Sequence, residues 1–555
     1  MPNVTFSKKR IVQNGITLTE LPSLIERLGM EIEEEDPSDI TISITPNRPD
    51  MLDTTGLCRA LRFISSRHVP RAKRYVLDDD VALNINVDKS VNLIRPFIAG
   101  MVVEDADLSK GRLVELMNFA EKFCDTFGRK RKKVAIGIHN MNAVDGDIKY
   151  CASPDGIMRP LGSLKEHKFS SVIESTKQGI EYGHLLNGEY LSISDKSKTL
   201  ALIPIINSED TKVSENTTRL LIDITGTSKA GVDDAAAIIA CSFIDQGARV
   251  RPCRIVKEGI GEITPNLKYR EMKVRVSTIE STIGVKISPS KIVGLANKLG
   301  YNAARLGISS LYIVPPYRTD VISTRDIIED MAIAYGYDNI VPSQILASTI
   351  GSKNLDSSFD DLIAHMMVGF GFMEAINMYI TTQNECFGQM RLDYDPKHTV
   401  TIANSKSGSI MRSSILPSLI KNISISTQER MPYRLFEIGP VFKVDNGLPI
   451  ESDFMAAVSC HPKADFAEIK SYVKSMLSLL GIEQITLKES NISSLIPGRQ
   501  ATLSYMGIHI GTFGELHPEV LSNYKIEEPI ACVEIDLKAL HKAVGLAENF
   551  GRKIN

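Results

Sequence analysis

The stretch PPYRTDVISTRDIIEDMAIAYGYDNI (residues 315–340) contains one amphipathic helix whose polar face carries charge of a single sign. Ser323 is followed three residues later by Asp326, the Ser/Thr-x-x-acid pattern of a helix start, so we expect a helix that opens directly after Ser323. At about 100° per residue, Asp326, Glu329 and Asp330 fall within one arc of roughly 100°. The opposite side is apolar and carries Ile327, Ile328, Met331 and Tyr335.

The acids of this stretch, with Asp320 just upstream, have no lysine nearby to balance them. Acids in the first turn of a helix are favourable by roughly 0.3–1 kcal/mol each, but like charges three or four residues apart cancel part of that gain. A carboxylate cluster without counter-charge is relieved by protonation, by a basic partner or by a cation, and Mg²⁺ prefers such oxygen ligands. On the residues alone, a solvated acidic face or a salt-bridge surface for another subunit remains an alternative.

The composition predicts a soluble globular protein of about three to five domains, with 555 residues, 43% hydrophobic and 24% charged. The formal net charge of −3 argues against a protein that coats polyanions. The opening residues MPNVTFSKKR lack the apolar core of a secretory signal, and no run of about 18 apolar residues predicts a membrane span. The 8 cysteines never occur at C-x-x-C spacing, which fits reduced thiols. We therefore expect a cytoplasmic protein.

Strand and helix patterns alternate along the chain, which predicts an α+β fold divided into several units. The turn-forming segment KEGIGEITPN (257–266) predicts a boundary between two units. The polar segment STIGSKNLDSS (348–358) predicts a linker before a β-rich C-terminal part.

Two segments share a turn that leads into a helix, NRPDMLDTTGLCRALRF from Asn47 and YRTDVISTRDIIEDMAI from Tyr317. Both contain Arg-x-Asp, two apolar residues, a capping residue (Asp53 or Ser323), a threonine and an apolar helix face. In the first copy, the positions of the three helix acids carry Gly56, Arg59 and Ala60. The turn and helix can therefore be built without the acids, which favours a function for them.

A second polar cluster lies in LALIPIINSEDTKVSENTTRLLIDITGTS (200–228), beside apolar runs typical of strands. Its amide, hydroxyl and carboxylate side chains are Asn207, Ser208, Asp210, Asp223, Thr225 and Thr227. Composition alone favours turn and strand-end roles for such residues. No Ser/His/Asp triad is evident in this cluster.

Long motifs over nearly the whole chain resemble, in the same order, those of the β subunit of phenylalanyl-tRNA synthetases. They are TPNRPDMLDTTGLCRALR (45–62), IPIINSEDTKV (203–213), LLIDITGTS (220–228), the stretch 315–340, ANSKSGSIMRSSILPSLI (403–420), RLFEIGPVF (434–442) and GELHPEV (514–520). The length and organisation resemble the archaeal and eukaryotic type. The chain lacks room for the extra N-terminal tRNA-binding fold and the C-terminal anticodon-binding module of bacterial β subunits.

The resemblance implies an α2β2 complex that attaches phenylalanine to its tRNA with ATP as substrate, the synthetic site being on the α subunit. It implies an N-terminal module (1–85), a B3/B4-like editing domain (90–255), a B5-like metal-bearing module (263–345) and a catalytically inactive class II synthetase-like antiparallel-sheet domain (356–555). It also implies one Mg²⁺ ion shared with the α subunit. The matching ligands in this sequence are Asp320, Asp326, Glu329 and Asp330.

The resemblance further implies that the editing domain hydrolyses tyrosine attached by mistake to the phenylalanine tRNA. An apolar pocket rejects an added hydroxyl by only roughly a hundredfold, so a second site that hydrogen-bonds this hydroxyl is needed. We expect the 207–208 and 223–227 segments to form the walls of that site, with His139 and Asp234 as further candidates, although a structural role for His139 remains open. Two alternatives also remain open, a non-catalytic scaffold subunit with a decayed editing site and a free-standing hydrolase of mischarged tRNA.

Arg434, three residues before Glu437, faintly resembles the arginine of class II synthetase folds that grips ATP. A core strand with an interface helix is the stronger interpretation here, with Arg412, Ser413 and Ser414 in packing and subunit contact.

Two basic stretches, GRKRKK (128–133) and RFISSRHVPRAKR (62–74), have two open interpretations. They either contact tRNA phosphates or form solvated loops.

Overall fold

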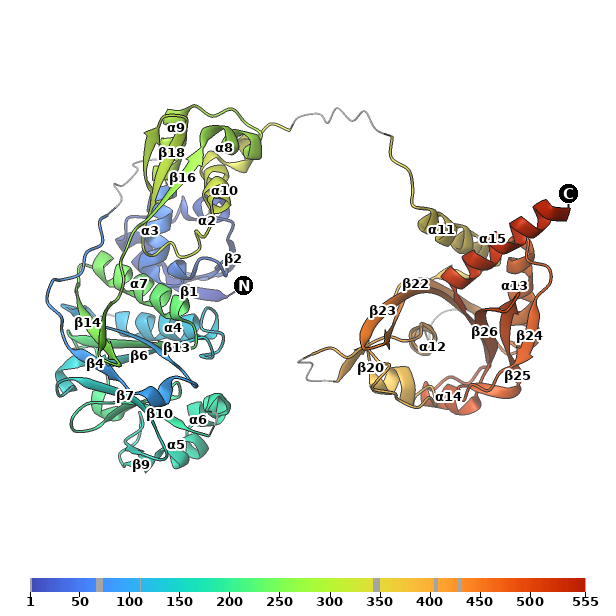
Figure 1. Ribbon diagram of the computed structural model, residues 1–555, viewed down its shortest axis with the longest axis horizontal. Coiled ribbons are helices and arrows are strands. Elements are labelled where there is room, and N and C mark those ends of the chain that lie inside the picture. Colours follow the sequence, from blue (N-terminus) through green and yellow to red (C-terminus); the bar gives the residue numbers. More distant parts are fainter. Residues whose placement is uncertain are drawn as a thin grey trace. The chain divides into compact units, whose positions relative to one another are not determined.

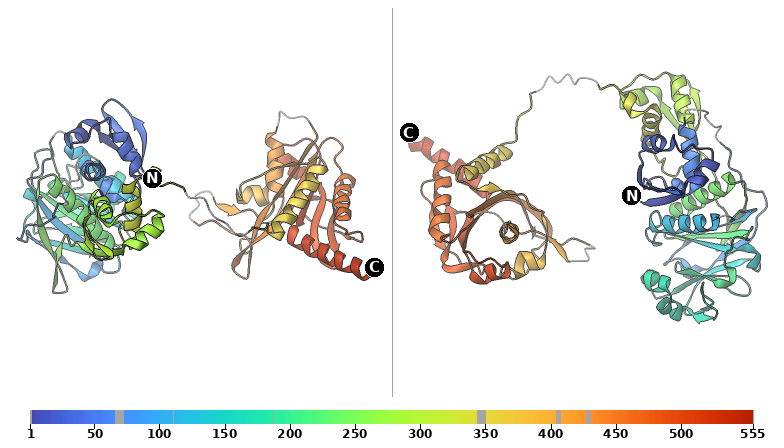
Figure 2. Two further views of the ribbon diagram at one scale, coloured as in Figure 1. Left: turned by 90° about the horizontal axis from the view of Figure 1, so that it is seen from above. Right: turned by 180° about the vertical axis from the view of Figure 1, so that it is seen from behind.

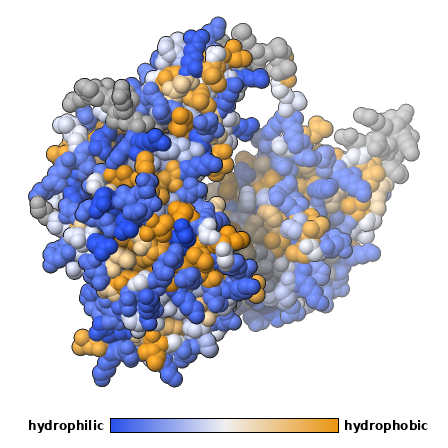
Figure 3. Space-filling model, turned by 60° about the vertical axis from the view of Figure 1, so that its left-hand side comes forward, coloured by the Kyte–Doolittle hydropathy of each residue, from blue (hydrophilic) through white to orange (hydrophobic). Residues whose placement is uncertain are grey.

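The computed structural model describes residues 2–554 except 66–72, 110, 187, 343–349, 404–407 and 427–430. The chain divides into two compact units, residues 1–344 and residues 345–555 (Figure 1). Both units combine helices with sheets, which confirms the predicted α+β fold class. Of the helices in the described ranges, none is both long and apolar enough to span a bilayer. Hydrophilic residues cover most of the face drawn in Figure 3, with apolar residues in smaller patches.

The first segment of unit 1 is a three-stranded sheet of order β1-β3-β2, with helices beside it. The bounds are β1 (Asn3–Ser7), α1 (Lys8–Gln13), α2 (Leu21–Arg27), β2 (Glu31–Glu35), β3 (Asp39–Ser43) and α3 (Thr54–Ile64). The Asp53 carboxylate caps α3 by accepting the backbone N–H of Gly56, which confirms the predicted cap. A Cβ at Gly56 would lie 1.7 Å from the Asp50 carbonyl oxygen, so the turn into α3 requires glycine there.

The middle of unit 1 is a ten-stranded sheet with the path β12-β11-β10-β7-β4-β14-β5-β13-β6 and β15 paired to β14. The bounds are β4 (Asn84–Val87), β5 (Phe97–Glu104), β6 (Val134–Asn140), β7 (Ile148–Ser153), β10 (Tyr190–Ser194), β11 (Thr199–Ile203), β12 (Ile206–Asn207), β13 (Leu220–Gly226), β14 (Arg249–Lys257) and β15 (Ile260–Thr264). Helices α4 (Arg112–Asp125) and α7 (Lys229–Asp245) cover one face, as the views in Figures 1 and 2 show. The antiparallel pairing of β13 with β6 sets Asp223 opposite Gly137.

The predicted boundary segment 257–266 is for most of its length a hairpin of the central sheet, and the chain leaves the sheet near the end of this segment. β14 turns into β15 at Glu258 and Gly259, whose φ angles are 52° and 81°, and Lys257 pairs with Ile260. Two successive residues with positive φ make the tight turn that matches the twist of paired strands. The turn formers therefore mark a strand-to-strand turn, and the chain leaves this sheet only after Thr264.

The last segment of unit 1 is a second three-stranded sheet, of order β16-β18-β17, with helices packed against it. The bounds are β16 (Arg270–Arg275), α8 (Val276–Ile283), α9 (Pro289–Asn297), β17 (Asn302–Leu306), β18 (Ser309–Val314) and α10 (Thr324–Tyr335). Helix α10 begins directly after Ser323 with a capping box formed by Ser323 and Asp326, which confirms the predicted helix start. Its buried residues include Ile327 and Met331 of the predicted apolar side.

Unit 2 is built on a seven-stranded sheet of order β19-β22-β23-β27-β26-β25-β24, antiparallel except for the parallel β19–β22 pair. The strands are β19 (Met373–Glu374), β22 (Tyr433–Asp445), β23 (Leu448–Cys460), β24 (Thr486–Glu489), β25 (Leu495–Tyr505), β26 (Ile508–Leu516) and β27 (Ile530–Asp536). The helices are α11 (Leu355–Gly369), α12 (Leu416–Ile425), α13 (Phe466–Leu479), α14 (Pro518–Asn523) and α15 (Leu537–Ile554). Successive β23 residues alternate between two cores, one shared with α11, α13 and α15 and the other with α12 and α14. Helix α12 lies inside the curve of the sheet (Figure 1).

Two predicted features fall partly outside the described residues. Residues 348 and 349 of the predicted linker are among the undescribed ones, and residues 350–354 have no regular structure. Helix α11 begins at Leu355, so the last four residues of the predicted linker are helical. Of the basic stretch 62–74, residues 66–72 are also undescribed.

Candidate functional site

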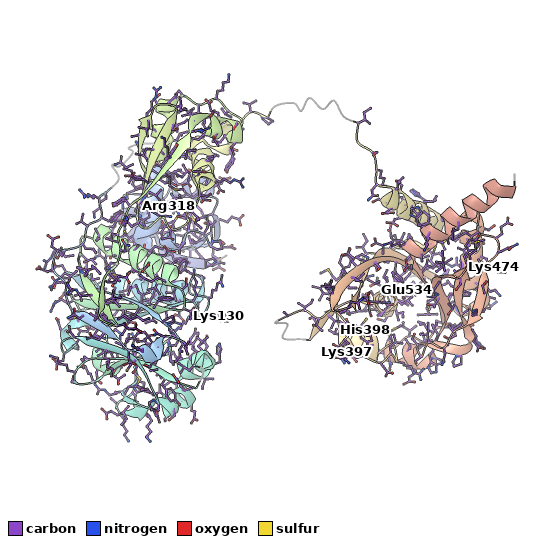
Figure 4. All side chains as sticks on the ribbon, in the orientation of Figure 1. Lys130, Arg318, Lys397, His398, Lys474 and Glu534 are labelled. Atoms are coloured by element: carbon purple, nitrogen blue, oxygen red, sulfur yellow. The ribbon has the colours of Figure 1, made fainter. Side chains whose placement is uncertain are left out.

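The acidic cluster before and on α10 contains its own counter-charge. The Arg318 side chain is 2% exposed, and its Nη2 lies 2.8 Å from Asp320 Oδ2 and 2.6 Å from Asp330 Oδ2. The Tyr301 hydroxyl also donates to Asp330. Burial disfavours the charged guanidinium, but the two carboxylates outweigh it and hold the pKa of Arg318 well above its usual value. Two of the four predicted metal ligands are thus ion-paired within unit 1, where Figure 4 labels Arg318.

The other two acids have different surroundings. Asp326 Oδ2 accepts the backbone N–H groups of two preceding residues, at 2.8 and 2.6 Å, as part of the cap of α10, and Glu329 is exposed. Within the described ranges, no three His, Cys, Asp or Glu side chains are grouped so that they could hold a metal ion. The expectation of a cluster without counter-charge is wrong, because Arg318 pairs with both Asp320 and Asp330. Within this chain Asp320 and Asp330 are held by Arg318, so the Mg²⁺ site that the four acids were expected to share with an α subunit stays a prediction.

In each of the two Arg-x-Asp turns noted in the sequence, the arginine forms an ion pair with the aspartate two residues later. Arg48 donates from Nε and Nη2 to the two oxygens of Asp50, at 2.8 and 2.9 Å, and Arg318 binds Asp320 through the same two nitrogens. Burial raises the pKa of Asp320, but Arg318 and then Arg48 lower it below its usual value. The positive charge of Arg48 in the first turn therefore favours the ionised form of Asp320 in the second turn. This interaction links the first and last segments of unit 1.

A cavity of about 160 Å³ opens in the central sheet of unit 1, beside β6, β11, β12 and β13. Its wall is largely apolar, with the 202–206 segment as its longest continuous part. A few polar groups in a mostly apolar wall are typical of small-molecule sites. The polar wall residues are Arg131, Gln178, Asn207, Asp223 and Thr225.

Asp223 has one oxygen with a partner and one without. The residue is 1% exposed, and its Oδ1 lies 3.0 Å from His139 Nε2. The other ring nitrogen of this histidine lies 2.8 Å from the Thr211 hydroxyl. Asp223 Oδ2 is buried without a hydrogen-bond partner among the described atoms. An unpaired buried acceptor costs roughly 1–3 kcal/mol, and a ligand that donates to it is one explanation for its presence.

Glycine at position 137 makes room for this carboxylate. Gly137 stands opposite Asp223 in the pairing of β6 with β13. A Cβ on Gly137 would lie 2.1 Å from Asp223 Oδ1, far inside contact distance. Any side chain at this position would therefore displace the carboxylate.

The two other predicted wall residues are held by hydrogen bonds. Asn207 Nδ2 donates to the Ile138 carbonyl at 3.2 Å. Thr225 Oγ1 accepts from Arg95 Nε at 2.9 Å, which leaves the threonine hydroxyl hydrogen free to donate. Arg95 is 4% exposed, and burial lowers its pKa to about 10.

The remaining predicted editing residues lie outside this wall. The Ser208 hydroxyl donates to the Arg159 carbonyl at 3.0 Å, and Asp210 forms an ion pair with the side chain of Arg159. Thr227 Oγ1 donates to a backbone carbonyl of the 128–133 loop at 3.2 Å. Asp234 lines a separate open groove of about 820 Å³. None of these four residues lines the cavity.

Sequence reasoning missed Gln178, Arg131 and Gly137 as wall residues. Gln178 comes from α6 (Lys177–Tyr182) and Arg131 from a loop before β6, both far in sequence from the 200–228 stretch. The sequence offered one sign of the role of Gly137: this glycine lies within a strand-like run, two residues before His139.

The predicted polar residues of unit 2 are used in packing. Arg434 Nη2 lies 3.2 Å from Glu468 Oε1, and Glu437 binds the buried Arg412 at 2.5 Å. Arg434 and Glu437 are therefore engaged with different partners, and Arg412 packs within unit 2, in agreement with the packing interpretation of the sequence.

Comparison with known families gives the class of this protein. Residues 341–537 match the family described as phenylalanyl tRNA synthetase beta chain CLM domain, and residues 272–337 match the tRNA synthetase B5 domain. With the multidomain α+β fold, these matches define a subunit of an aminoacyl-tRNA synthetase.

Relatives that align over the whole chain give the family. The phenylalanine–tRNA ligase beta subunit of Archaeoglobus fulgidus is 33% identical over 97% of this chain and 98% of the relative. The beta subunit of Methanocaldococcus jannaschii is 32% identical over 97% of this chain and 100% of the relative. A solved N-terminal fragment of the Pyrococcus horikoshii beta subunit has a TM-score of 0.58 at 28% identity and covers 60% of this chain and 100% of that fragment. The chain belongs to the phenylalanine–tRNA ligase beta subunit family, which confirms the resemblance found in the sequence.

Proposed function

We propose that this chain joins an α subunit in a cytoplasmic α2β2 complex that uses ATP to attach phenylalanine to its tRNA. Family membership supports the partner and the reaction. We assign ATP and phenylalanine binding to the α subunit and a supporting role to this chain. The proposed domains are an N-terminal module (1–85), an editing domain (90–255), a B5-like module (263–345) and an inactive class II synthetase-like domain (356–555). The nearly all-antiparallel sheet of unit 2 supports the last assignment.

We further propose that the cavity at Asp223 binds the tyrosine side chain of mischarged tyrosyl-tRNA. The observation that carries this proposal is the buried, unpaired Oδ2 of Asp223 in the wall of a cavity of about 160 Å³. An apolar cavity of about 150 Å³ binds benzene in another protein, so this one has room for an aromatic ring. A tyrosine hydroxyl would donate to the free oxygen, whereas a phenylalanine ring would leave it unpaired.

A site that hydrogen-bonds the tyrosine hydroxyl would distinguish tyrosine from phenylalanine more strongly than an apolar synthetic pocket does. A site built to hydrogen-bond a hydroxyl rejects the analogue without it by about 10⁴–10⁵-fold, whereas an apolar pocket excludes an added hydroxyl by only about 10²-fold. The reaction is ester hydrolysis. A water adds to the carbonyl carbon, the bond to the ribose oxygen breaks, and tyrosine and free tRNA leave. Within the described cavity wall there is no Ser/His/Asp triad, so this chain acts by positioning the substrate and the water.

Deacylation of tyrosyl-tRNA and phenylalanyl-tRNA by the purified complex tests this function. We expect hydrolysis of the first and not of the second. Asp223→Asn should lower kcat/KM for tyrosyl-tRNA by about 100-fold, because the free acceptor oxygen is lost while an oxygen remains for His139. Ser208→Ala is the matched control, since Ser208 lies outside the cavity wall, and it should leave the rate unchanged. Equal hydrolysis of both substrates, or full activity of Asp223→Asn, would contradict the proposal.

A further inference from the structure

The basic loop 128–133 has an unusual backbone. It connects α4 to β6, and three successive residues, Arg129, Lys130 and Arg131, have φ angles of 53°, 52° and 64°. The left-handed region is disfavoured for residues with a Cβ and is normally visited by single residues. A run of three persists only where surrounding contacts hold it in place. The neighbouring Lys132 and Lys133 make the whole segment cationic.

Contacts from the cavity wall hold this loop. Arg131 Nη1 donates to the carbonyls of Pro204 at 3.1 Å and Ile205 at 2.7 Å, and both of these residues line the cavity. The Arg131 guanidinium also stacks over the Tyr182 ring, 4.2 Å from its centroid. The loop is thus fastened to the same wall that carries Asp223.

The buried Arg95 also holds the loop in place through hydrogen bonds. Its Nη1 donates to the Lys132 carbonyl at 3.3 Å, while its Nε and Nη2 bind the hydroxyl and the carbonyl of Thr225 at 2.9 and 2.7 Å. Thr225 is itself a wall residue. Two buried or half-buried arginines therefore fix the loop backbone beside the cavity.

Three cations of the loop are left without an ion pair among the described residues. Arg129, Lys130 and Lys132 are exposed, and in the part of the chain that the structure describes none of them has an ion pair. Lys130 extends from the edge of unit 1 in Figure 4. A strained loop fastened at two points thus presents three unpaired positive charges next to a cavity, a surface that fits a polyanion held in a fixed position.

We propose that Arg129, Lys130 and Lys132 bind phosphates of the single-stranded 3′ end of tRNA while its terminal aminoacyl group lies in the Asp223 cavity. This inference rests on the function proposed above. Phosphate contacts position a nucleic acid without reading its sequence, so the loop would set the register of the terminal nucleotide and the cavity would select the amino acid. An RNA partner is favoured over an acidic protein because the loop and the cavity share one wall.

The test removes the three charges in the complete complex. The variant R129Q/K130Q/K132Q should raise KM for tyrosyl-tRNA by about tenfold with little change in kcat, because phosphate contacts contribute binding alone. The slope of log KM against log salt should fall by about 2, since each phosphate contact on a single strand contributes roughly 0.7. The control K273Q/R275Q/K286Q removes the same number of exposed charges from the β16–α8 region and should leave both quantities unchanged.

A binding experiment separates failure of this inference from failure of the proposed hydrolysis. Affinity is measured for intact tRNA and for tRNA that lacks its single-stranded 3′ end. The loop variant should bind intact tRNA more weakly than the unmodified complex does and should bind truncated tRNA equally well. This result supports the inference even if the unmodified complex hydrolyses nothing. An unchanged KM and affinity in the loop variant, or an equal loss in the control variant, would overturn it.

Discussion

Asp223 and Asp330 are both buried aspartates of unit 1, but their partners differ. Asp330 Oδ2 lies 2.6 Å from the Arg318 guanidinium and also accepts from the Tyr301 hydroxyl. Asp223 has a partner for one oxygen only, and its second oxygen is buried and unpaired among the described atoms. Asp330 thus has a cation and a hydroxyl as partners, whereas Asp223 keeps a buried oxygen without a partner and lines a cavity.

The partners that an acid has in the folded structure distinguish a structural acid from a functional one better than crowding in the sequence does. The four acids at 320–330 crowd together in the sequence, yet an arginine from the same stretch pairs with two of them. Asp223 stands alone in an apolar strand, where composition favours a strand-end role. A buried carboxylate paired with a cation contributes to the fold, and one whose buried oxygen lacks a partner is available to a ligand.

The largest expected effect is a loss of stability when the cation that pairs with Asp320 and Asp330 is removed. Arg318→Met should lower the free energy of unfolding by about 3–5 kcal/mol, because it leaves two buried carboxylates without their counter-charge. Urea unfolding of the chain measures this loss. The control Arg325→Met removes an exposed arginine of α10 and should change stability by less than about 0.5 kcal/mol. An Arg318→Met protein with an unchanged free energy of unfolding would show that Asp320 and Asp330 do not depend on Arg318 as their counter-charge.

The next largest effect is on hydrolysis, from crowding of the open carboxylate. In Gly137→Ala the new Cβ would lie 2.1 Å from Asp223 Oδ1, so the carboxylate must shift. A displacement of about 1 Å at a positioning group costs on the order of 100-fold in rate, and we expect such a loss in deacylation of tyrosyl-tRNA. Gly294→Ala is the matched control, because nothing lies within 4 Å of its added Cβ. Retained activity in Gly137→Ala would remove Asp223 from the site.

Local features of the fold were predictable because their signals lie within a few residues of each other. The start of α10 at Ser323 and the cap of α3 at Asp53 are examples. The hairpin in the 257–266 segment was missed because the same turn formers serve a hairpin and a domain boundary. Only the pairing of Lys257 with Ile260 distinguishes the two.

The site was predictable only where its residues lie in one stretch. Asn207, Asp223 and Thr225 belong to the 200–228 segment and share the cavity wall. Gly137 reaches the cavity through the register of β6 against β13, which the sequence does not specify. The partnership of Arg318 with Asp330, which are 12 residues apart, likewise depends on how the turn before α10 folds back.

A smaller effect is expected from the single partner of Asp223. His139→Gln keeps a donor for Asp223 Oδ1 but loses the ring contact to Thr211 at 2.8 Å, so the carboxylate is held less firmly. Loss of one hydrogen bond is worth about 1 kcal/mol, and kcat/KM for tyrosyl-tRNA should fall by about fivefold. Thr211→Val removes the same contact from the other side and should lower the rate in the same direction. Activity that persists in both variants would mean that Asp223 needs no positioning partner.

The smallest effect is expected at Glu329, the acid that neither pairs with Arg318 nor caps α10. Glu329 is exposed and has no ion pair among the described residues, so Glu329→Gln should change the free energy of unfolding by less than about 0.5 kcal/mol. The same variant decides the magnesium hypothesis for the four acids. If Arg318 is the cation of this cluster, elemental analysis of the assembled complex should find the same magnesium content in Glu329→Gln and in the unmodified protein. A drop in bound magnesium together with a weaker subunit contact would show that the partner subunit completes an ion site there. In that case Arg318 would be an additional charge rather than a replacement for the metal.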